Sequence, residues 1–378
     1  MPDHVAIRLD VARRVAPTLL VLSLVSCATP GRVSTAADID DLARNVASNE
    51  ALYKNIQFTY KESYIDHRPK RKKESTLPTI RKDESTRRLV YQGDKVFSSE
   101  NSASTNFNSS GENATSRASA WNGRVAHALN GKILHIIDEA IDTATWPRPH
   151  NLLVPYFIRM PLSVMCEGGS SPRRIKGRGD LNLDTEVVGR EQLDGDECVK
   201  LKVLSHRDGE DPVRNGYVRV FWINTAKNYL PVRMIGYRAN SSPDHIEGLA
   251  VTESMIGLED GLWFPERIVY KTYDADGGFK AGTPRLETTI VCSDVELNPK
   301  NDPSLFSDIP VGPDVLKYRI KNGKIVETIR PLIHATTPPP DATAPREGPS
   351  ASTYAGMAGG AGLLAALAMF LRSKLGRN

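Results

Sequence analysis

The sequence predicts a mainly β fold of the α+β type, in which one amphipathic helix precedes a large antiparallel sheet. Two observations support this prediction. Apolar residues recur at helical spacing in a short segment that begins at Ile39, and from Ile56 onward the apolar period changes to two residues. Farther along the chain, short apolar runs alternate with polar or Gly- and Pro-rich segments, which is typical of strands joined by turns.

The helix is expected first, because Thr35 and Asp38 match a capping box at its start. Its apolar positions follow the helical period: Ile39, Leu42, Ala43, Val46 and Ala47. Ile56, Phe58 and Tyr60 then alternate with polar residues, so a long strand with one apolar face should begin there.

Two groups of strands are expected after that. Asn-Gly pairs at 122–123 and 130–131 predict two-residue turns in a three-strand meander, and a third pair at 322–323 predicts another hairpin. The second group has five expected strands: Tyr217 to Ile223, Leu230 to Tyr237, Leu249 to Ile256, Phe264 to Tyr273 and Leu286 to Val295. Residues 146–165 are apolar but interrupted by prolines, which favours short helices and loops that could cover a sheet. The Ser- and Asn-rich segment 98–119 is longer than a plain hairpin loop.

Residues 1–27 have the pattern of an export signal. Two arginines precede the apolar run Val15 to Val25, which is too short to span a bilayer comfortably. The run ends in the tetrapeptide LVSC, which resembles a bacterial lipobox and implies that Cys27 is lipidated and becomes the first mature residue. Ordinary cleavage near Ala28 and an uncleaved anchor are the alternatives.

The C-terminal region predicts a second attachment to a membrane. Residues 352–371 include a stretch from Tyr354 to Leu371 that is uncharged and apolar or small, and the basic tail 372–378 follows, as expected of a transmembrane helix with a cytoplasmic end. Five prolines in 336–350 predict an extended linker between that helix and the β domain, residues 34–330. The domain would then lie on the periplasmic, extracytoplasmic side of a bacterial cell envelope.

Composition and charge exclude several classes of protein. Hydrophobic residues make up 40% and charged residues 25%, as in ordinary globular proteins. The net charge of +4, from 49 basic and 45 acidic residues, is too near balance to indicate a nucleic-acid partner. The four cysteines lack the close spacing of a zinc or redox motif, and if Cys27 is lipidated an odd number remains: Cys166, Cys198 and Cys292.

The sequence offers no recognised catalytic, metal or cofactor motif. It has no Gly-x-Ser-x-Gly elbow, Walker loop, HExxH helix or dinucleotide fingerprint, so we expect neither an enzyme nor a cofactor. His127 and His135 lie on adjacent expected strands, but the predicted turn pairs His127 with Leu134 and places His135 opposite Ala126, on the other face. Two histidines on opposite faces cannot share a metal ion.

Several sequence phrases resemble one family. DGDECVKL at Asp194 to Leu201 is followed by VFWI at Val220 to Ile223, YLPVR at Tyr229 to Arg233 and GLWFP at Gly261 to Pro265. In this order they resemble bacterial proteins of the LolA/LolB-like lipoprotein-sorting family, over roughly residues 39–314. The resemblance implies a half-open β-barrel that covers short helices. It also implies a concave apolar cavity that binds lipid or the acyl chains of lipoproteins.

The resemblance leaves three hypotheses. The first is a membrane-anchored, non-enzymatic carrier-like domain, although a C-terminal membrane helix would prevent it from shuttling between membranes. Its ligand contacts would come from residues on the expected strands, some of which are by type more often core residues: Tyr217, Phe221, Trp222, Trp263, Phe264 and Ile268. The second is an envelope stress sensor or scaffold that binds a protein partner, because RseB-type regulators share the fold. The third is an enzyme of unrecognised type.

Overall fold

The structure is a computed structural model that describes residues 36–67, 81–105, 112–139, 143, 146–154, 160–174, 180–273 and 284–330. Within these residues, sixteen strands form one sheet in the order β16-β15-β6-β5-β4-β3-β2-β1-β14-β13-β12-β11-β10-β9-β8-β7. Neighbouring strands are antiparallel, except that β6 and β15 pair in parallel. The sheet stays open, because β16 and β7 end it without pairing to each other. The predicted large antiparallel sheet in a half-open arrangement is therefore confirmed.

The strands have the following bounds. The first six are β1 (Asn55–Asp66), β2 (Arg81–Gln92), β3 (Lys95–Thr105), β4 (Glu112–Trp121), β5 (Ala126–Asn130) and β6 (Ile133–Ile137). The next five are β7 (Gly169–Arg174), β8 (Asp180–Leu193), β9 (Asp196–Arg207), β10 (Tyr217–Asn224) and β11 (Leu230–Arg238). The last five are β12 (Gly248–Gly257), β13 (Trp263–Thr272), β14 (Leu286–Leu297), β15 (Leu316–Lys321) and β16 (Lys324–Ile329).

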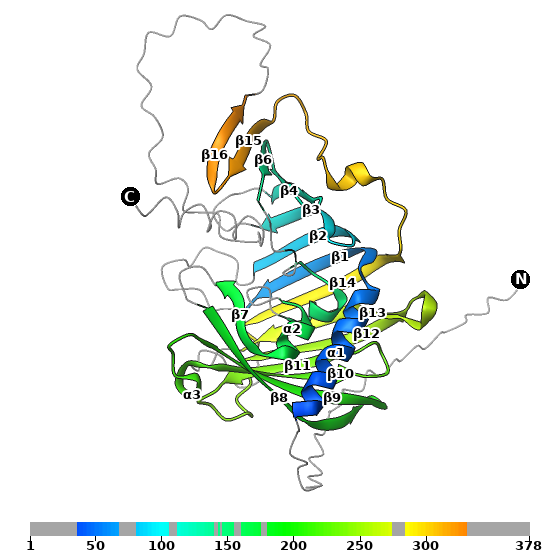
Figure 1. The fold of residues 1–378 in the computed structure, drawn as a ribbon, viewed down its shortest axis with the longest axis vertical. Coiled ribbons are helices and arrows are strands. Elements are labelled where there is room, and N and C mark those ends of the chain that lie inside the picture. The colour runs from blue at the N-terminus through cyan, green and yellow to red at the C-terminus, as the bar shows by residue number, and fades with distance from the viewer. Residues whose placement is uncertain are drawn as a thin grey trace, which may run out of the picture. The chain divides into compact units, whose positions relative to one another are not determined.

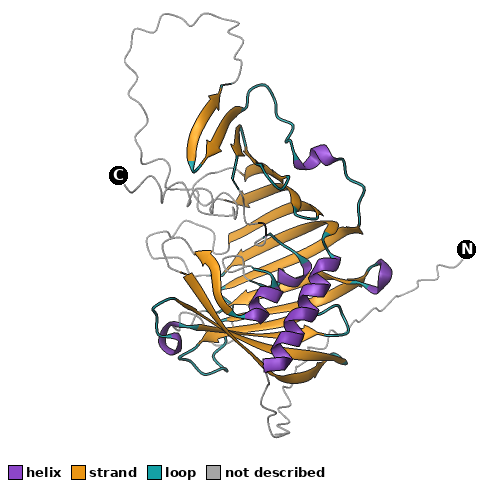
Figure 2. Cartoon of the chain, viewed as in Figure 1, coloured by secondary structure: helices purple, strands orange, loops and turns teal. Residues whose placement is uncertain are grey.

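Two helices lie against one face of this sheet (Figure 1). These are α1 (Ala36–Leu52) and α2 (Leu162–Glu167), which is much shorter. A short 3-10 helix, η2 (Pro149–Asn151), lies in the segment between β6 and α2. The remaining short helices lie in connections between strands: α3 (Pro212–Asn215), η4 (Glu259–Gly261) and η5 (Pro303–Phe306). Figure 2 shows how little helix there is beside the strands.

The main hydrophobic core lies between the helices and the sheet. In β1, Ile56, Phe58 and Tyr60 are all buried in this core, as their alternation with polar residues predicts. The apolar side of α1, with Leu42, Ala43 and Val46, packs into the same core, as do the buried residues of α2. We call the helix-covered side of the sheet the core face and the opposite side the outer face.

Most of the predicted elements are present. The helix, the long first strand, the five strands of the second group and the hairpin at 322–323 all form close to their expected bounds. The Ser- and Asn-rich segment is largely paired strand, because its residues up to 105 belong to β3 and those from 112 belong to β4. Most of this segment is therefore strand, and small polar side chains are compatible here with a regular ladder.

The predicted register of the first meander is wrong by two residues. Between β4 and β5 the connection spans four residues, 122–125, and the side chain of Asn122 accepts hydrogen bonds from two backbone amides within it. Between β5 and β6 the turn is Gly131 and Lys132, with Gly131 at φ 57°, so Asn130 pairs with Ile133. A shift of two residues keeps every side chain on its predicted face, because side chains alternate with a period of two.

The predicted membrane segments lie outside the described residues. This applies to the export signal with Cys27, to the linker 336–350, to the helix 352–371 and to the basic tail. These four therefore remain predictions. In the described part of the chain, no helix is both long enough and apolar enough to cross a membrane.

Candidate functional site

Three of the predicted contact residues meet on the core face. Phe221 of β10, Phe264 of β13 and Ile268 of β13 all belong to the main core, and each is almost fully buried. The rings of Phe264 and Phe58 lie 5.0 Å apart at 59°, so they link strands β13 and β1 across β14. These side chains are covered by the chain's own helices, and whether they contact a ligand remains a prediction.

The other three predicted residues are placed differently. Trp222 lies on the outer face with Val218, Val220 and Cys198, because it alternates with Phe221 along β10. Its indole Nε1 donates to Glu191, and its ring lies between the cations of Lys200 and Arg233. Trp222 therefore does not share a surface with Phe221.

Tyr217 and Trp263 are only partly buried. The ammonium of Lys227 lies 5.2 Å from the centre of the Trp263 ring. The backbone carbonyl of Trp263 accepts a hydrogen bond from the hydroxyl of Tyr53, and its amide donates to the side chain of Asn228 at 2.9 Å. Trp263 thus lies where the end of α1 meets the β10–β11 connection.

A half-buried carboxylate joins the two helices that cover the core face. Glu50 of α1 accepts hydrogen bonds from the amide of Leu162 at 2.7 Å and from the hydroxyl of Ser163 at 2.5 Å, both in α2. Burial raises the pKa of Glu50 above its ordinary value, although the hydrogen bonds from α2 oppose that shift. The covering helices therefore dock on the sheet as a linked pair.

A buried histidine connects the segment between β6 and α2 to the sheet. The Nε2 atom of His150 lies 2.8 Å from the carbonyl of Asn228, and its ring meets the edge of Tyr53 at 5.5 Å. Burial lowers the pKa of His150 to about 4, so the ring is neutral at physiological pH and its Nε2–H donates a hydrogen bond to that carbonyl. The segment is therefore fixed to the β10–β11 connection by a neutral hydrogen bond.

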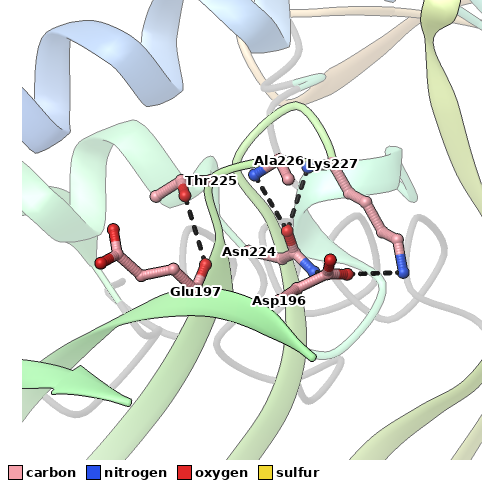
Figure 3. Close-up of polar contacts among 6 residues, drawn as sticks. All are labelled: Asp196, Glu197, Asn224, Thr225, Ala226 and Lys227. Atoms are coloured by element: carbon pink, nitrogen blue, oxygen red, sulfur yellow. Dashed lines mark hydrogen bonds and ion pairs between the residues drawn. The ribbon is translucent and has the colours of Figure 1, made fainter. Parts of the chain in front are cut away.

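The β10–β11 connection is itself held by a polar network (Figure 3). The side-chain oxygen of Asn224 accepts hydrogen bonds from the amides of Ala226 and Lys227, both at 3.0 Å. Its side-chain amide donates to Asp196 at 2.8 Å, and Asp196 also pairs with the ammonium of Lys227 at 2.9 Å. The network joins the start of β9 to the end of β10, which explains why these polar residues occur beside apolar strands.

The opposite end of β10 carries a buried cation on the core face. Arg219 alternates with Phe221 and is 5% exposed, and its Nη1 donates to Ser205 of β9 at 2.9 Å. The guanidinium carbon lies 4.4 Å from the centre of the Tyr217 ring. Burial lowers the pKa of Arg219, and Tyr217 and Tyr270 are the neighbours that oppose this shift. The core face is thus apolar in its middle and cationic at one end.

Histidine and cysteine residues do not assemble into a metal site in the described part of the chain. No group of three or more His, Cys, Asp or Glu side chains there is placed to hold a metal ion. In β5 and β6, His127 pairs with Ile136 and His135 with Ala128, which leaves the two histidines on opposite faces. The three described cysteines, Cys166, Cys198 and Cys292, are buried and form no disulfide.

Glu50, His150 and Arg219 were not identified from the sequence. Glu50 and Ser163 are separated by 113 positions, so no local pattern could pair them. His150 lies in a proline-rich segment whose path the sequence does not determine. Arg219 did carry a signal, because it stands on the same face of an apolar strand as Phe221, where a charged residue is rare unless it has a partner.

Comparisons with known proteins give matches in structure only. No protein-family model and no curated protein sequence matches the chain. A DUF1329 family protein from Desulfovibrio piger is 11% identical, with 71% of this chain and 96% of that chain covered and a TM-score of 0.39. A domain described as outer membrane lipoprotein-sorting, from Vibrio parahaemolyticus, is 8% identical, with 71% and 97% covered and a TM-score of 0.35. LprF from Mycobacterium bovis is 11% identical, with 71% and 99% covered and a TM-score of 0.26.

The matched structures each cover 71% of this chain, but each has a TM-score below 0.5. At identities near one residue in ten and at these TM-scores, the similarity carries no argument about the family or the function of this chain. No ligand or partner of those proteins is carried over to this chain by it.

Proposed function

We propose that this chain is a non-enzymatic envelope protein that binds lipid or lipoprotein acyl chains between its open sheet and the helices packed on it. The observation that carries the proposal is the core face itself. It is a continuous apolar surface on an open sheet, and short helical segments cover it instead of a second sheet. An acyl chain needs a long apolar surface shielded from water, and the apolar side of α1 already occupies such a surface.

Displacement of α1 from the core face would expose that surface to a ligand. Glu50 links α1 to α2 by polar contacts, whereas α1 meets the sheet through apolar side chains such as Leu42 and Val46. Apolar contacts are not directional, so an acyl chain can replace those of the helix. The ligand would then compete with the helix for one surface.

This competition predicts that weaker docking of α1 raises affinity for acyl chains. Leu42→Ala removes buried apolar contacts and increases the fraction of open protein, so a fluorescent fatty acid should bind the variant more tightly than the wild type. Arg44→Ala changes an exposed residue on the other side of α1 and should leave affinity unchanged. Fluorescence titration measures both, and mass spectrometry of lipid extracted from the purified protein identifies natural ligands. The carrier function is wrong if neither the wild type nor the Leu42→Ala variant binds saturably.

A second candidate function is an envelope sensor or scaffold that binds a protein. The edge strand β16 favours it, because Ile325, Val326 and Ile329 are exposed there and a sheet edge can pair with a strand of another protein. The full chain should then capture a stable protein partner, and the substitution Ile325→Lys in β16 should abolish that capture. This result would favour the sensor or scaffold function over lipid binding.

Attachment to the membrane belongs to the proposal. Residues 352–371 would anchor the domain on the periplasmic side, and a lipidated Cys27 would add a second anchor. Metabolic labelling with a palmitate analogue should label the wild-type protein and should be lost in Cys27→Ala, because that cysteine ends the lipobox-like tetrapeptide. Equal labelling of both proteins would contradict lipidation at this residue.

A further inference from the structure

Arg219 has an incomplete set of partners although it is buried. Its Nη1 donates to Ser205 and its guanidinium stacks on Tyr217, but the Nε atom is buried without a hydrogen-bond partner. An arginine side chain keeps its proton in proteins. A buried positive charge with an unused donor is therefore present on the core face, where desolvation makes it unfavourable.

A second arginine on the same face, which is only partly buried, has a carboxylate partner. Arg87 of β2 is paired with the carboxylate of Glu100 at 3.2 Å and donates to the hydroxyl of Tyr60 at 2.8 Å. Around Arg219, by contrast, the described residues supply hydroxyl groups and aromatic rings but no ion pair with a carboxylate. The charge of Arg87 is neutralised within the fold, and that of Arg219 is not.

The surroundings of Arg219 place this charge next to the apolar surface. Along the core face of β10, Tyr217 and Arg219 come first, and Phe221 and Ile223 follow in the main core. Successive side chains on one face of a strand are about 7 Å apart. The guanidinium of Arg219 therefore lies at the edge of the apolar surface that Phe221 begins. Gly236 on β11 leaves room for the Tyr217 ring, because a Cβ there would lie 2.7 Å from the tyrosine hydroxyl oxygen.

We propose that Arg219 binds the anionic head group, a carboxylate or a phosphate, of an amphiphile whose acyl chain lies on the core face. This inference rests on the proposed function and names its ligand class. The planar guanidinium suits both head groups, because it can donate from Nε and from a terminal nitrogen to two oxygens of one group. A neutral ester of the same chain length offers no charge to it.

The test compares a photoactivatable palmitic acid with its methyl ester on the full-length chain in nonionic detergent. The ratio of acid to ester labelling on peptides from β10 to β13 reports head-group recognition, and taking that ratio in each variant cancels unequal partition into micelles. In Arg219→Met the ratio should fall about tenfold relative to the wild type, the effect of losing one charge-assisted contact. In Arg233→Met it should not change, because that arginine lies on the outer face beside Trp222.

Further measurements separate the alternatives. If Arg219 served only to hold the fold, Arg219→Met would lower the thermal midpoint, whereas release of an unpaired buried charge should leave it equal or higher. An excess of inorganic phosphate should reduce acid labelling only partly, because a free anion lacks the acyl chain. Complete loss with phosphate would indicate a site for free anions and overturn the inference.

The failures of the two proposals differ. Equal labelling by acid and ester in the wild type would overturn the head-group inference and leave acyl-chain binding intact. The absence of saturable labelling by either probe would overturn the proposed function, and the head-group inference with it. The wild-type comparison gives this answer even if Arg219→Met does not fold.

Discussion

Replacement of Phe264 by alanine is expected to lower the free energy of unfolding by about 3–5 kcal/mol, the range for removing a buried aromatic side chain. The loss should fall at the high end of that range for two reasons. Phe264 is fully buried, and its ring contacts Phe58, which belongs to a strand two positions away in the sheet. The change leaves a cavity where β13, β1 and the covering helices meet.

Denaturant titration followed by tryptophan fluorescence measures this effect. Val291→Ala in β14 is the matched control, because Val291 is one of the exposed apolar residues and its loss should change stability by less than about 0.5 kcal/mol. A decrease of that small size for Phe264→Ala as well would contradict the core described for this face. Added fatty acid should restore part of the lost stability if acyl chains enter the new cavity.

Glu50→Ala is expected to lower the free energy of unfolding by about 1–3 kcal/mol for each buried polar group left without a partner. It leaves both the amide of Leu162 and the hydroxyl of Ser163 without their acceptor. Glu50→Gln keeps an oxygen at the same place and should lose much less. Denaturant titration of the three proteins separates loss of the hydrogen bonds from loss of the charge.

The same residue predicts a dependence on pH. Because burial raises the pKa of Glu50 from its ordinary value of 4.5, the folded protein binds this proton more tightly than the unfolded chain does. The stability contributed by that proton is fully present below pH 4.5 and is lost as the pH rises through the folded pKa. The wild type should therefore gain stability relative to Glu50→Gln as the pH is lowered toward 4.5. A difference that does not change with pH would contradict the raised pKa of Glu50.

The sequence predicted the strands well because a strand at the boundary of a core shows its period locally. Ile56, Phe58 and Tyr60 face the helices, and the polar residues between them do not. The choice of turn at residues 130–132 could not be predicted in the same way, because Asn130 and Gly131 both tolerate positive φ and only pairing with β6 selects Gly131.

The candidate site was predicted only in part, because its composition depends on which face each strand turns inward. Phe221 and Trp222 are neighbours in the sequence and equally apolar, and the structure places only Phe221 on the core face. Arg219 follows the same alternation, but its importance depends on which residues of the neighbouring strands lie beside it, and these include Ser205 of β9 and Gly236 of β11. Which residues surround Arg219 is determined by the order of the strands in the sheet, and no local sequence pattern indicates it.

The order of the strands also determines when the sheet can be completed. Strands β1 to β6 pair in sequence, as do β7 to β14, and the two series meet where β1 pairs with β14. Ile56 of β1 is therefore opposite Leu297 of β14. Strand β1 is synthesised early, but it cannot complete its pairing until β14 has been synthesised. Contacts between such distant residues are slow to form. Until β14 has been made, β1 would present an unpaired edge, and a chaperone or a misfolded copy could pair with the chain there.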